Sequence, residues 1–351
     1  MSEYIGGIAM KALVLKEYNH FVFEDAPMPE IREDEALARV KACAVCGSDV
    51  HGMDGSTGRR IPSVVMGHEA SGVVEKTGPL VTDFAAGDRV TFDSTIYCGE
   101  CYYCRQGKIN LCDNRRVLGV SCGEYRQNGA FAEYVAVPRR ILYRLPDAVT
   151  FERASMVEPL SVAVHALRNT PVVLGDTAVV VGTGMVGLLV VQTLKLAGVG
   201  KLIAVDLDAG RLELARKFGA TDTVISDPNA VPEILRLTGG RGADIAVEVV
   251  GIAPTVELAV GSLKKGGALT LVGNVSPEVK LPLQAVVTRE ISLHGSCASS
   301  GEYDVCLDLI ASGKVDVDSF ISAVAPLAEG ASWFDRLHAG EKGLMKVILK
   351  P

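Results

Sequence analysis

The sequence predicts an α/β protein of two domains, one rich in short strands and the other a doubly wound parallel sheet of six strands. The chain has 351 residues, of which 48% are apolar, so it is long enough for two separate cores. Before about residue 165, short β-type segments are separated by Gly, Pro and Asp. From about residue 177 to 296, apolar strands alternate with helical patterns, which is typical of a parallel sheet with helices on both faces.

The expected elements follow this division. In the first part, strands are expected at 11–15, 37–41, 71–75, 89–92 and 132–137. In the second part, strands are expected at 178–181, 202–205, 221–226, 243–249, 268–272 and 291–295, and helices at 185–197, 210–218, 231–237, 254–264 and 283–288. A helix at 303–311 and a strand at 345–349 follow, and this last strand has no place in the parallel sheet. We therefore expect it to return to the first domain, which would comprise 1–165 and 298–351, with a second domain at 166–297.

A glycine-rich turn, G-x-G-x-x-G, joins the first strand of the second domain to the helix that follows it. Such glycines permit a tight turn and a close approach of the backbone to a pyrophosphate, which the helix N-terminus then binds. Asp206, at the end of the second strand, is placed to accept hydrogen bonds from an adenosine ribose. This acid would repel a 2′-phosphate, so the sequence predicts NAD rather than NADP, although Arg211 nearby would favour the opposite. The predicted cofactor-binding residues are Gly182, Gly184, Met185, Val186, Gly187, Asp206 and Arg211.

Four cysteines, Cys98, Cys101, Cys104 and Cys112, lie close together in a polar segment. Four thiolates at this spacing can surround one tetrahedral Zn²⁺ ion. Disulfides over such short spans would be strained, and an iron–sulfur cluster would require a different spacing. The sequence therefore predicts a structural zinc site in which the protein fills all four positions.

A second group of candidate residues is spread along the chain and consists of Cys46, His68, Glu69 and Glu158. A thiolate, an imidazole and a carboxylate are a suitable set for a catalytic zinc ion with an open position. No spacing rule connects these residues, and each has a simpler interpretation, as a core thiol, a turn histidine or a helix N-terminal acid. From the residues alone, both interpretations stay open.

The charge and the cysteine content exclude several classes of protein. The net charge of −7 argues against nucleic acid or an anionic membrane as the main partner, and so against a zinc-ribbon nucleic-acid binder. No apolar segment approaches the length of a transmembrane helix, and the first ten residues lack the basic start and apolar run of a signal peptide, which indicates a short extension before the first strand. Nine cysteines in a chain of this size indicate metal binding in a reducing compartment, so we expect a cytoplasmic protein.

Several motifs in a fixed order resemble those of the zinc-dependent medium-chain alcohol dehydrogenase superfamily, and the resemblance extends from Met10 onward. The motifs are CGSDVH at 46–51, GHEASGVVEKTG at 67–78, GDRV at 87–90, the four-cysteine segment, AFAEY at 130–134, LPDAVTFE at 145–152, EPLSVAVHA at 158–166 and GTGMVG at 182–187. Within this superfamily, the chain is similar to sorbitol, galactitol-1-phosphate and threonine dehydrogenases. The resemblance implies a GroES-like catalytic domain, a Rossmann NAD-binding domain and an active site in the cleft between them.

The resemblance also implies roles for single residues. Cys46 and His68 would bind the catalytic zinc, with a carboxylate from one of two acids, directly or through a water molecule. Ser48 would contact the substrate oxygen, and His51 would pass the proton to solvent. The implied catalytic residues are Cys46, Ser48, His51, His68, Glu69 and Glu158, of which Cys46, His68, Glu69 and Glu158 are the candidate zinc ligands. The implied cofactors are two zinc ions per chain, one catalytic and one structural, and NAD.

The expected reaction is the transfer of a hydride from a secondary alcohol of a polyol, sugar or polyol phosphate to NAD. Ser-Cys-Ala at 296–298 stands where animal sorbitol dehydrogenases have Phe-Arg-Tyr, which disfavours sorbitol itself, whereas GIAPTVELAV at 251–260 is similar to a segment of the galactitol-phosphate enzymes. An arginine could bind a phosphate, but we interpret Arg59, Arg60, Arg115 and Arg116 as exposed loop charges. The alternatives are a threonine- or glucose-type dehydrogenase, and a binding or regulatory protein that retains the fold without turnover.

The last strand of the parallel sheet, at 291–295, is expected to lie at an edge. It is apolar enough to pair with its own copy across a two-fold axis. We therefore expect a homodimer or homotetramer, with a small-molecule alcohol as the substrate.

Overall fold

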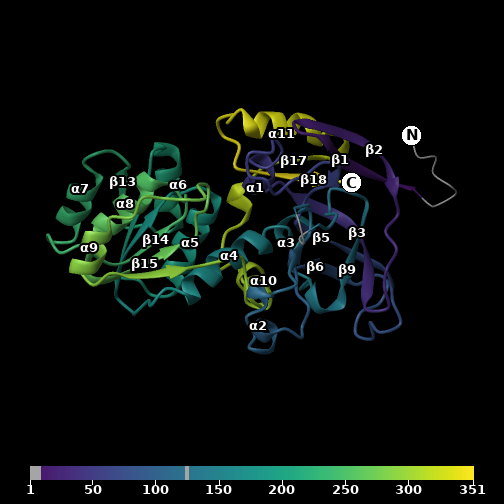
Figure 1. Cartoon of the computed structure of the whole chain (residues 1–351), viewed down its shortest axis with the longest axis horizontal. Coiled ribbons are helices and arrows are strands. Elements are labelled where there is room, and N and C mark those ends of the chain that lie inside the picture. Colours follow the sequence, from purple (N-terminus) through teal and green to yellow (C-terminus); the bar gives the residue numbers. More distant parts are fainter. Residues whose placement is uncertain (1–8, 123–125) are drawn as a thin grey trace. The chain divides into compact units, whose positions relative to one another are not determined.

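The computed structural model describes residues 9–122 and 126–351, so the expected N-terminal extension, residues 1–8, lies outside the described part. The chain forms two compact units (Figure 1). The first unit comprises Met1–Glu158, Tyr303–Gly313 and Val317–Pro351, and the second comprises Pro159–Glu302 and Lys314–Asp316. The division based on the sequence places the corresponding boundaries after residues 165 and 297.

The first unit consists of β-strands and short helices. Its strands are β1 (Ala9–Glu17), β2 (His20–Pro27), β3 (Glu35–Ala44), β4 (Val64–Val65), β5 (Glu69–Thr77), β6 (Arg89–Phe92), β7 (Thr95–Ile96), β8 (Arg116–Val117), β9 (Tyr134–Pro138), β10 (Leu142–Arg144), β17 (Ile321–Pro326) and β18 (Lys346–Lys350). Its helices are α1 (Gly47–Val50), α2 (Tyr102–Arg105), α3 (Phe151–Ala154), α10 (Tyr303–Ala311) and α11 (Gly330–His338). The largest sheet has the order β10-β6-β5-β3-β18-β17, with β9 also paired to β3, and the smaller sheets are β2-β1-β4 and β7-β8.

Strand β3 organises the first unit. Its sequence, EALARVKACA, is buried along nearly its whole length, because β3 pairs with β5, β9 and the C-terminal strand β18. The backbones of β3 and β5 approach closely, since a Cβ at Gly72 would lie 2.2 Å from the carbonyl oxygen of Arg39. In the register of the sheet, Ala44 lies opposite Glu69 on one side and opposite Ile348 on the other. The end of β3, the start of β5 and the last strand of the chain therefore meet at one place.

The second unit contains the six parallel strands that the sequence predicts. They are β11 (Thr177–Val181), β12 (Lys201–Asp206), β13 (Asp222–Ile225), β14 (Ala243–Glu248), β15 (Leu263–Leu271) and β16 (Ser292–Gly295), in the order β13-β12-β11-β14-β15-β16. Every neighbouring pair is parallel. The direction of winding changes between β11 and β14, and dinucleotides bind at the carboxyl ends of strands at such a point.

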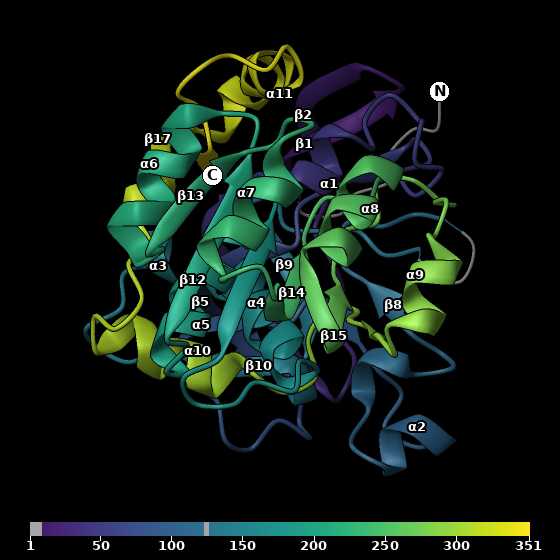
Figure 2. The same cartoon turned by 90° about the vertical axis from the view of Figure 1, so that its left-hand side faces the viewer.

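Helices cover both faces of this sheet. They are α4 (Val157–Arg168), which begins at the end of the first unit, α5 (Met185–Leu196), α6 (Ala209–Phe218), α7 (Ala230–Leu237), α8 (Ala253–Ser262) and α9 (Leu283–Thr288). Helices α5 and α6 contact each other and the strands β11 to β13, while α8 contacts α7, α9 and the strands β14 and β15 (Figures 1 and 2). Within the described ranges, no helix is both long and apolar enough to cross a membrane.

The structure corrects two details of the predicted elements. The helix expected to extend to residue 264 ends at Ser262, and β15 begins at Leu263 instead of residue 268, because Leu263 is fully buried and pairs with Ala243 in the sheet. Helix α11 is not among the elements expected from the sequence, and its Phe334 packs against Phe21 with 4.4 Å between the ring centroids. In both places, tertiary packing decides the local conformation.

Candidate metal centre and dinucleotide site

Three of the four predicted ligands of the catalytic zinc lie together where β3, β5 and β18 meet. Cys46 follows β3 and precedes α1, while His68 and Glu69 lie at the start of β5. One potential ligand atom of each residue lies within 4.8 Å of those of the other two. The turn before His68 requires glycine, because Gly67 has a φ of +94° and a Cβ there would lie 2.8 Å from Cys43 Sγ.

The Nδ1 side of the His68 imidazole faces a carboxylate, that of Asp49. The Nδ1 atom of His68 lies 3.4 Å from Asp49 Oδ2, and both side chains are buried. Burial alone would lower the pKa of His68, but the Asp49 carboxylate and the Cys46 sulfur raise it well above its ordinary value. Burial alone would raise the pKa of Asp49, but His68 and Arg60 lower it below its ordinary value. An Nδ1–H group directed at a carboxylate leaves Nε2 available to a metal ion.

Glu69 is held by a buried cation from the C-terminal strand. The Nζ atom of Lys346 lies 2.6 Å from Glu69 Oε2, and the side chains are 1% and 0% exposed. Lys346 also donates a hydrogen bond to the carbonyl oxygen of Val45 at 3.0 Å. The other oxygen of Glu69, Oε1, has no hydrogen-bond partner among the residues described.

This donor set fits a zinc ion. Zinc binds thiolate, imidazole and carboxylate groups, and three protein ligands leave a fourth position for water or substrate. A fully buried carboxylate oxygen without a partner is costly in a folded protein, and a metal ion would satisfy it.

Glu158, the fourth predicted ligand, is not part of this close group. Its partly buried side chain lies at the start of α4 and accepts a hydrogen bond from Ser94 Oγ at 3.3 Å. Removal from water raises the pKa of Glu158 to about 7, with His68 opposing this shift and Glu69 adding to it. Glu158 is therefore an acid that interacts electrostatically with the metal group without joining it.

The raised pKa of Glu158 predicts a pH dependence of stability in the metal-free protein. The folded-state pKa of about 7 lies above the ordinary value of 4.5, so the folded state binds this proton more tightly than the unfolded chain. The resulting stabilisation is complete below pH 4.5 and is lost as the pH rises through about 7. In the wild type, this loss lowers the free energy of unfolding between about pH 5 and about pH 8. We expect Glu158→Gln to remove this contribution, so that the difference between the free energies of urea unfolding at the two pH values becomes smaller. Equal differences in the wild type and the variant would contradict the prediction.

The two residues expected to move the proton lie on or next to α1. Ser48 Oγ donates a hydrogen bond to Cys46 Sγ at 3.3 Å, so it lies beside the metal group. His51 follows α1 and is exposed. An exposed imidazole can exchange protons with water.

The four cysteines of the second predicted zinc site also converge. Their sulfur atoms all lie within 4.8 Å of one another, with 3.5 Å between Cys98 and Cys112 and 4.0 Å between Cys98 and Cys104. Zn–S bonds of about 2.3 Å in a tetrahedron place the sulfur atoms about 3.8 Å apart, which these distances match. The backbone N–H groups of Glu100 and Cys101 lower the pKa of the Cys98 thiol to about 6 and so favour the thiolate that a metal ion requires.

The glycine-rich turn has the geometry of a dinucleotide site. Gly182 has a φ of +91°, and a Cβ at Gly187 would lie 1.9 Å from the Gly182 carbonyl oxygen, so both positions require glycine. A Cβ at Gly184 would meet no atom within 4 Å, which leaves the backbone open to a ligand. Among the described residues, no side chain caps the N-terminus of α5, where Met185 and Val186 form the first turn, so its N–H groups can bind a pyrophosphate.

Asp206 is connected to the same turn. Its Oδ2 atom accepts a hydrogen bond from the N–H of Thr183 at 2.7 Å, and its Oδ1 atom accepts one from the N–H of Asp208 at 3.0 Å. Arg211 Nη1 lies 3.8 Å from Oδ1. Each carboxylate oxygen can accept a second hydrogen bond, so the side chain can still bind ribose hydroxyls.

Glu248, which the sequence analysis missed, holds the loop that follows β14. Its Oε1 atom accepts hydrogen bonds from the N–H groups of Val250 and Gly251 and from Thr255 Oγ1, at 2.8, 2.7 and 2.7 Å. This loop lies beside the glycine-rich turn, because a Cβ at Gly182 would lie 2.4 Å from Val250 Cγ2. Glu248 therefore fixes a second wall of the expected dinucleotide site.

Three residues of the metal region were also missed or misinterpreted. Asp49 lies within the CGSDVH motif, which could have indicated it. Lys346 lies 277 positions from Glu69, so no local pattern connects the two. The interpretation of Arg60 as an exposed loop charge is wrong, because Arg60 is 3% exposed and forms an ion pair with Asp49 at 2.8 Å.

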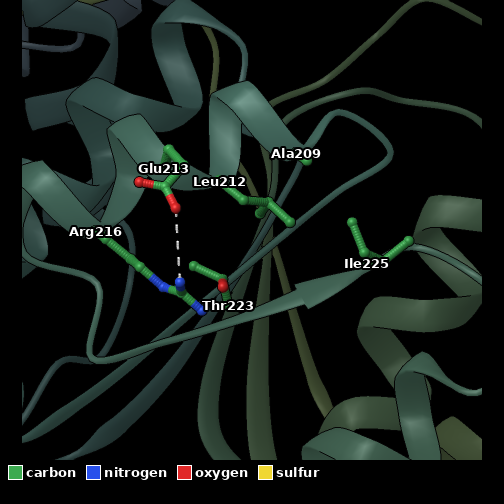
Figure 3. Close-up of a pocket in the computed structure, with 6 residues that line it drawn as sticks. All are labelled: Ala209, Leu212, Glu213, Arg216, Thr223 and Ile225. Carbon is green, nitrogen blue, oxygen red and sulfur yellow. Dashed lines mark ion pairs between the residues drawn. The ribbon is translucent and has the colours of Figure 1, made fainter.

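Figure 3 shows an open hollow on the second unit, between α6 and the edge strand β13. It is lined by Ala209, Leu212, Glu213, Arg216, Thr223 and Ile225. Its two charged side chains, Glu213 and Arg216, pair with each other at 3.9 Å. None of the predicted site residues lines this hollow, and we assign it no role.

A metal group with an open position and a dinucleotide-binding turn, present in one chain, define the class of metal-dependent dehydrogenases. Comparisons with known proteins agree with this class. The family model described as alcohol dehydrogenase GroES-like domain matches residues 32–147, and the one described as zinc-binding dehydrogenase matches residues 185–312. D-xylulose reductase A of Aspergillus oryzae is 36% identical over 349 residues, which cover 96% of each chain.

Solved structures give the same result. A zinc-binding dehydrogenase from Sinorhizobium meliloti 1021, bound to NADP, is 31% identical with a TM-score of 0.89, over 98% of this chain and 100% of that chain. Galactitol-1-phosphate dehydrogenase from Escherichia coli is 26% identical with a TM-score of 0.89, over 97% and 100%. The chain belongs to the zinc-dependent medium-chain alcohol dehydrogenase superfamily and is an oxidoreductase that uses zinc and a nicotinamide cofactor.

Proposed function

We propose that the protein is an NAD-dependent polyol dehydrogenase that oxidises a secondary alcohol to a ketone. The observation that carries this proposal is the convergence of Cys46, His68 and Glu69, whose buried oxygen Glu69 Oε1 has no hydrogen-bond partner among the residues described. The similarity to a D-xylulose reductase indicates the substrate class, a free polyol such as xylitol with the ketose as its product.

We assign each residue of the site a separate role in this reaction. The three converging side chains would hold the zinc ion, and Glu158 would replace Glu69 or bind through a water molecule if it moved toward the group. Zinc bound there would act as a Lewis acid that lowers the pKa of the substrate hydroxyl. Ser48 Oγ would accept the hydroxyl proton while giving up its own, and the exposed His51 would pass that proton to solvent. A bound nicotinamide cofactor would supply the acceptor for the hydride of the carbinol carbon.

The arginines support an unphosphorylated substrate. Arg60 is buried and paired with an acid, so it cannot bind a phosphate. Arg115 donates a hydrogen bond to the carbonyl oxygen of Asn110 at 2.7 Å. Among the four arginines considered in the sequence, Arg59 is the one that is exposed. A single exposed arginine is a weak phosphate site, so a polyol phosphate is the less favoured substrate.

The test is the formation of reduced nicotinamide by zinc-loaded protein with saturating NAD. The panel contains xylitol, sorbitol, galactitol and arabitol, the phosphate esters of these polyols, and threonine and glucose. We expect a free polyol to have a kcat/KM at least about tenfold above that of its phosphate ester. A pocket built for a hydroxyl leaves the added phosphate without a partner, and one such unpaired group is enough for a tenfold ratio. Threonine or glucose as the best substrate would replace the proposal by the threonine- or glucose-type alternative. No turnover of any member would favour a binding protein that retains the fold.

We further infer a cytoplasmic location. All nine cysteines lie within the described ranges, and none of them is in a disulfide bond there. Five of these thiols belong to the two groups arranged for metal binding, four in one group and Cys46 in the other. Such thiols require a reducing compartment, because oxidation would compete with the metal ion.

We also propose that the protein forms a homodimer through β16. This strand is at the edge of its sheet, and apolar side chains are exposed on it and near it, with Leu293 38%, Leu283 62% and Val287 66% exposed. An edge strand of this kind can continue the sheet into a second copy across a two-fold axis.

Leu293→Lys is expected to shift the protein toward the monomer, because it places a charge in the centre of the proposed interface. The measurement is the molar mass in solution by light scattering. Leu196→Lys is the matched control, since Leu196 is 47% exposed on α5, away from the edge strand. If both variants keep the mass of the wild type, β16 is not the interface.

A further inference from the structure

We propose that Arg60 is a positioning residue of the metal centre, which orients His68 through Asp49 and holds the hydroxyl of Ser48 at the same time. The inference extends the proposed function, because it assigns a residue to the zinc site on which that function rests.

The guanidinium of Arg60 is aimed at one oxygen of Asp49. Its Nε and Nη2 atoms donate to Oδ1 at 3.1 and 2.8 Å. The second oxygen, Oδ2, is thereby left to face His68 Nδ1 at 3.4 Å. Two hydrogen bonds from a rigid planar group hold Oδ1 in place, and Oδ2 then faces the imidazole as an ion-pair contact. Neither Oδ2 nor Nδ1 has a hydrogen bond among the residues described, so each is the other's charged neighbour.

Burial makes this chain of contacts depend on each of its members. The side chains of Arg60, Asp49 and His68 are 4%, 0% and 7% exposed. A carboxylate without water requires a partner of opposite charge, and among the described residues Arg60 is the cation that hydrogen-bonds to Asp49. Removal of the guanidinium would leave His68 as the remaining partner, so the ring would be drawn toward Asp49 and away from the metal position.

Arg60 also reaches the residue that we expect to touch the substrate. Its Nη2 atom lies 3.4 Å from Ser48 Oγ. A donor at this oxygen occupies one of its lone pairs, and the hydroxyl hydrogen is then free to point to Cys46 Sγ, which lies 3.3 Å away. One side chain therefore contacts both of the groups on α1 that serve the metal centre.

The local backbone makes room for this side chain. A Cβ at Gly52 would lie 2.6 Å from Arg60 Cγ and 2.9 Å from the carbonyl oxygen of Ser48. Glycine at this position lets the aliphatic part of Arg60 pass close to the end of α1, and the guanidinium can then reach its two partners.

The neighbouring residue provides a matched control. Arg59 has the same side chain and the adjacent position in the chain, but it is exposed, whereas Arg60 is buried. Any effect of positive charge in this loop would be shared by the two residues, and an effect on the metal centre would belong to Arg60 alone.

The experiment compares Arg60→Met, Arg60→Lys and Arg59→Met in the full-length, zinc-loaded protein. A zinc chelator is titrated against each variant, and the release of the two ions is followed separately, with the four-cysteine ion as an internal reference. We expect Arg60→Met to weaken zinc binding at the catalytic site about 10- to 100-fold, as is usual when a partner of a ligand is lost. Arg59→Met should match the wild type, and the four-cysteine ion should be retained in all variants.

Arg60→Lys keeps the test decisive if Arg60→Met does not fold. Lysine retains the buried positive charge but lacks the planar pair of donors, so we expect a smaller loss of zinc affinity and a changed absorption spectrum of Co²⁺ placed at the catalytic site. Wild-type zinc affinity and an unchanged cobalt spectrum in a folded Arg60→Lys protein would overturn the proposal, as would equal effects of Arg59→Met and Arg60→Met. These readouts need no substrate, so a failure of the proposed polyol reaction would not be confused with a failure of this inference.

Discussion

Replacing Cys46 by serine is expected to remove one of two bound zinc ions and to lower kcat/KM for the alcohol at least about 1,000-fold, because a Lewis acid contributes several kcal/mol to such a reaction. Cys46 supplies the sulfur atom of the close group, and a serine hydroxyl is a poor zinc ligand at neutral pH. The measurements are zinc content per chain and steady-state kinetics at matched protein concentration.

Two further variants show whether the effect belongs to this site. Cys43→Ala changes a fully buried thiol three positions earlier that is not part of either metal group, so both zinc ions and most of the activity should remain. Cys104→Ser should remove the other ion, that of the four-cysteine site, and lower the thermal stability. A Cys46→Ser protein that keeps both ions and its activity would show that the close group is not the catalytic metal centre.

The close group could be predicted from the sequence only in part. Residue types that suit zinc were visible, but physical rules gave no reason to connect residue 46 with residues 68 and 69. The structure supplies the reason as sheet register, because Ala44 on β3 lies opposite Glu69 on β5. In the sequence analysis, the resemblance to a family made this connection. The parallel sheet, by contrast, was predictable without that help, because its alternating pattern is local.

The burial of charged side chains could not be predicted from the sequence. Arg59 and Arg60 are identical neighbours, and one is exposed while the other is buried against Asp49. Lysine is usually a surface residue, but Lys346 is buried against Glu69. Nothing in the local pattern separates these cases, because the partner that compensates each charge comes from a distant part of the chain.

Replacing Asp206 by serine is expected to change the ratio of kcat/KM for NAD to that for NADP about 100-fold or more in favour of NADP. We propose that the carboxylate binds the ribose hydroxyls and repels a 2′-phosphate, and Arg211 Nη1 lies 3.8 Å from its Oδ1. A lost hydrogen bond to a charged group costs about 1.5–3 kcal/mol. Relief of the charge repulsion adds to this, and about 2.7 kcal/mol corresponds to a factor of 100. Steady-state kinetics with each cofactor give the ratio.

The ratio is the informative quantity because Asp206 has a second task. It accepts hydrogen bonds from the N–H groups of Thr183 and Asp208, so its loss should weaken the turn and lower the affinity for both cofactors together.

Asp206→Asn removes the charge but keeps one acceptor, and it therefore separates the repulsion of the phosphate from the support of the turn. Adding Arg211→Met to Asp206→Ser should reverse most of the gain with NADP, because it removes the cation that the phosphate would meet. If Asp206→Ser binds both cofactors more weakly at an unchanged ratio, this carboxylate supports the turn and does not select the cofactor.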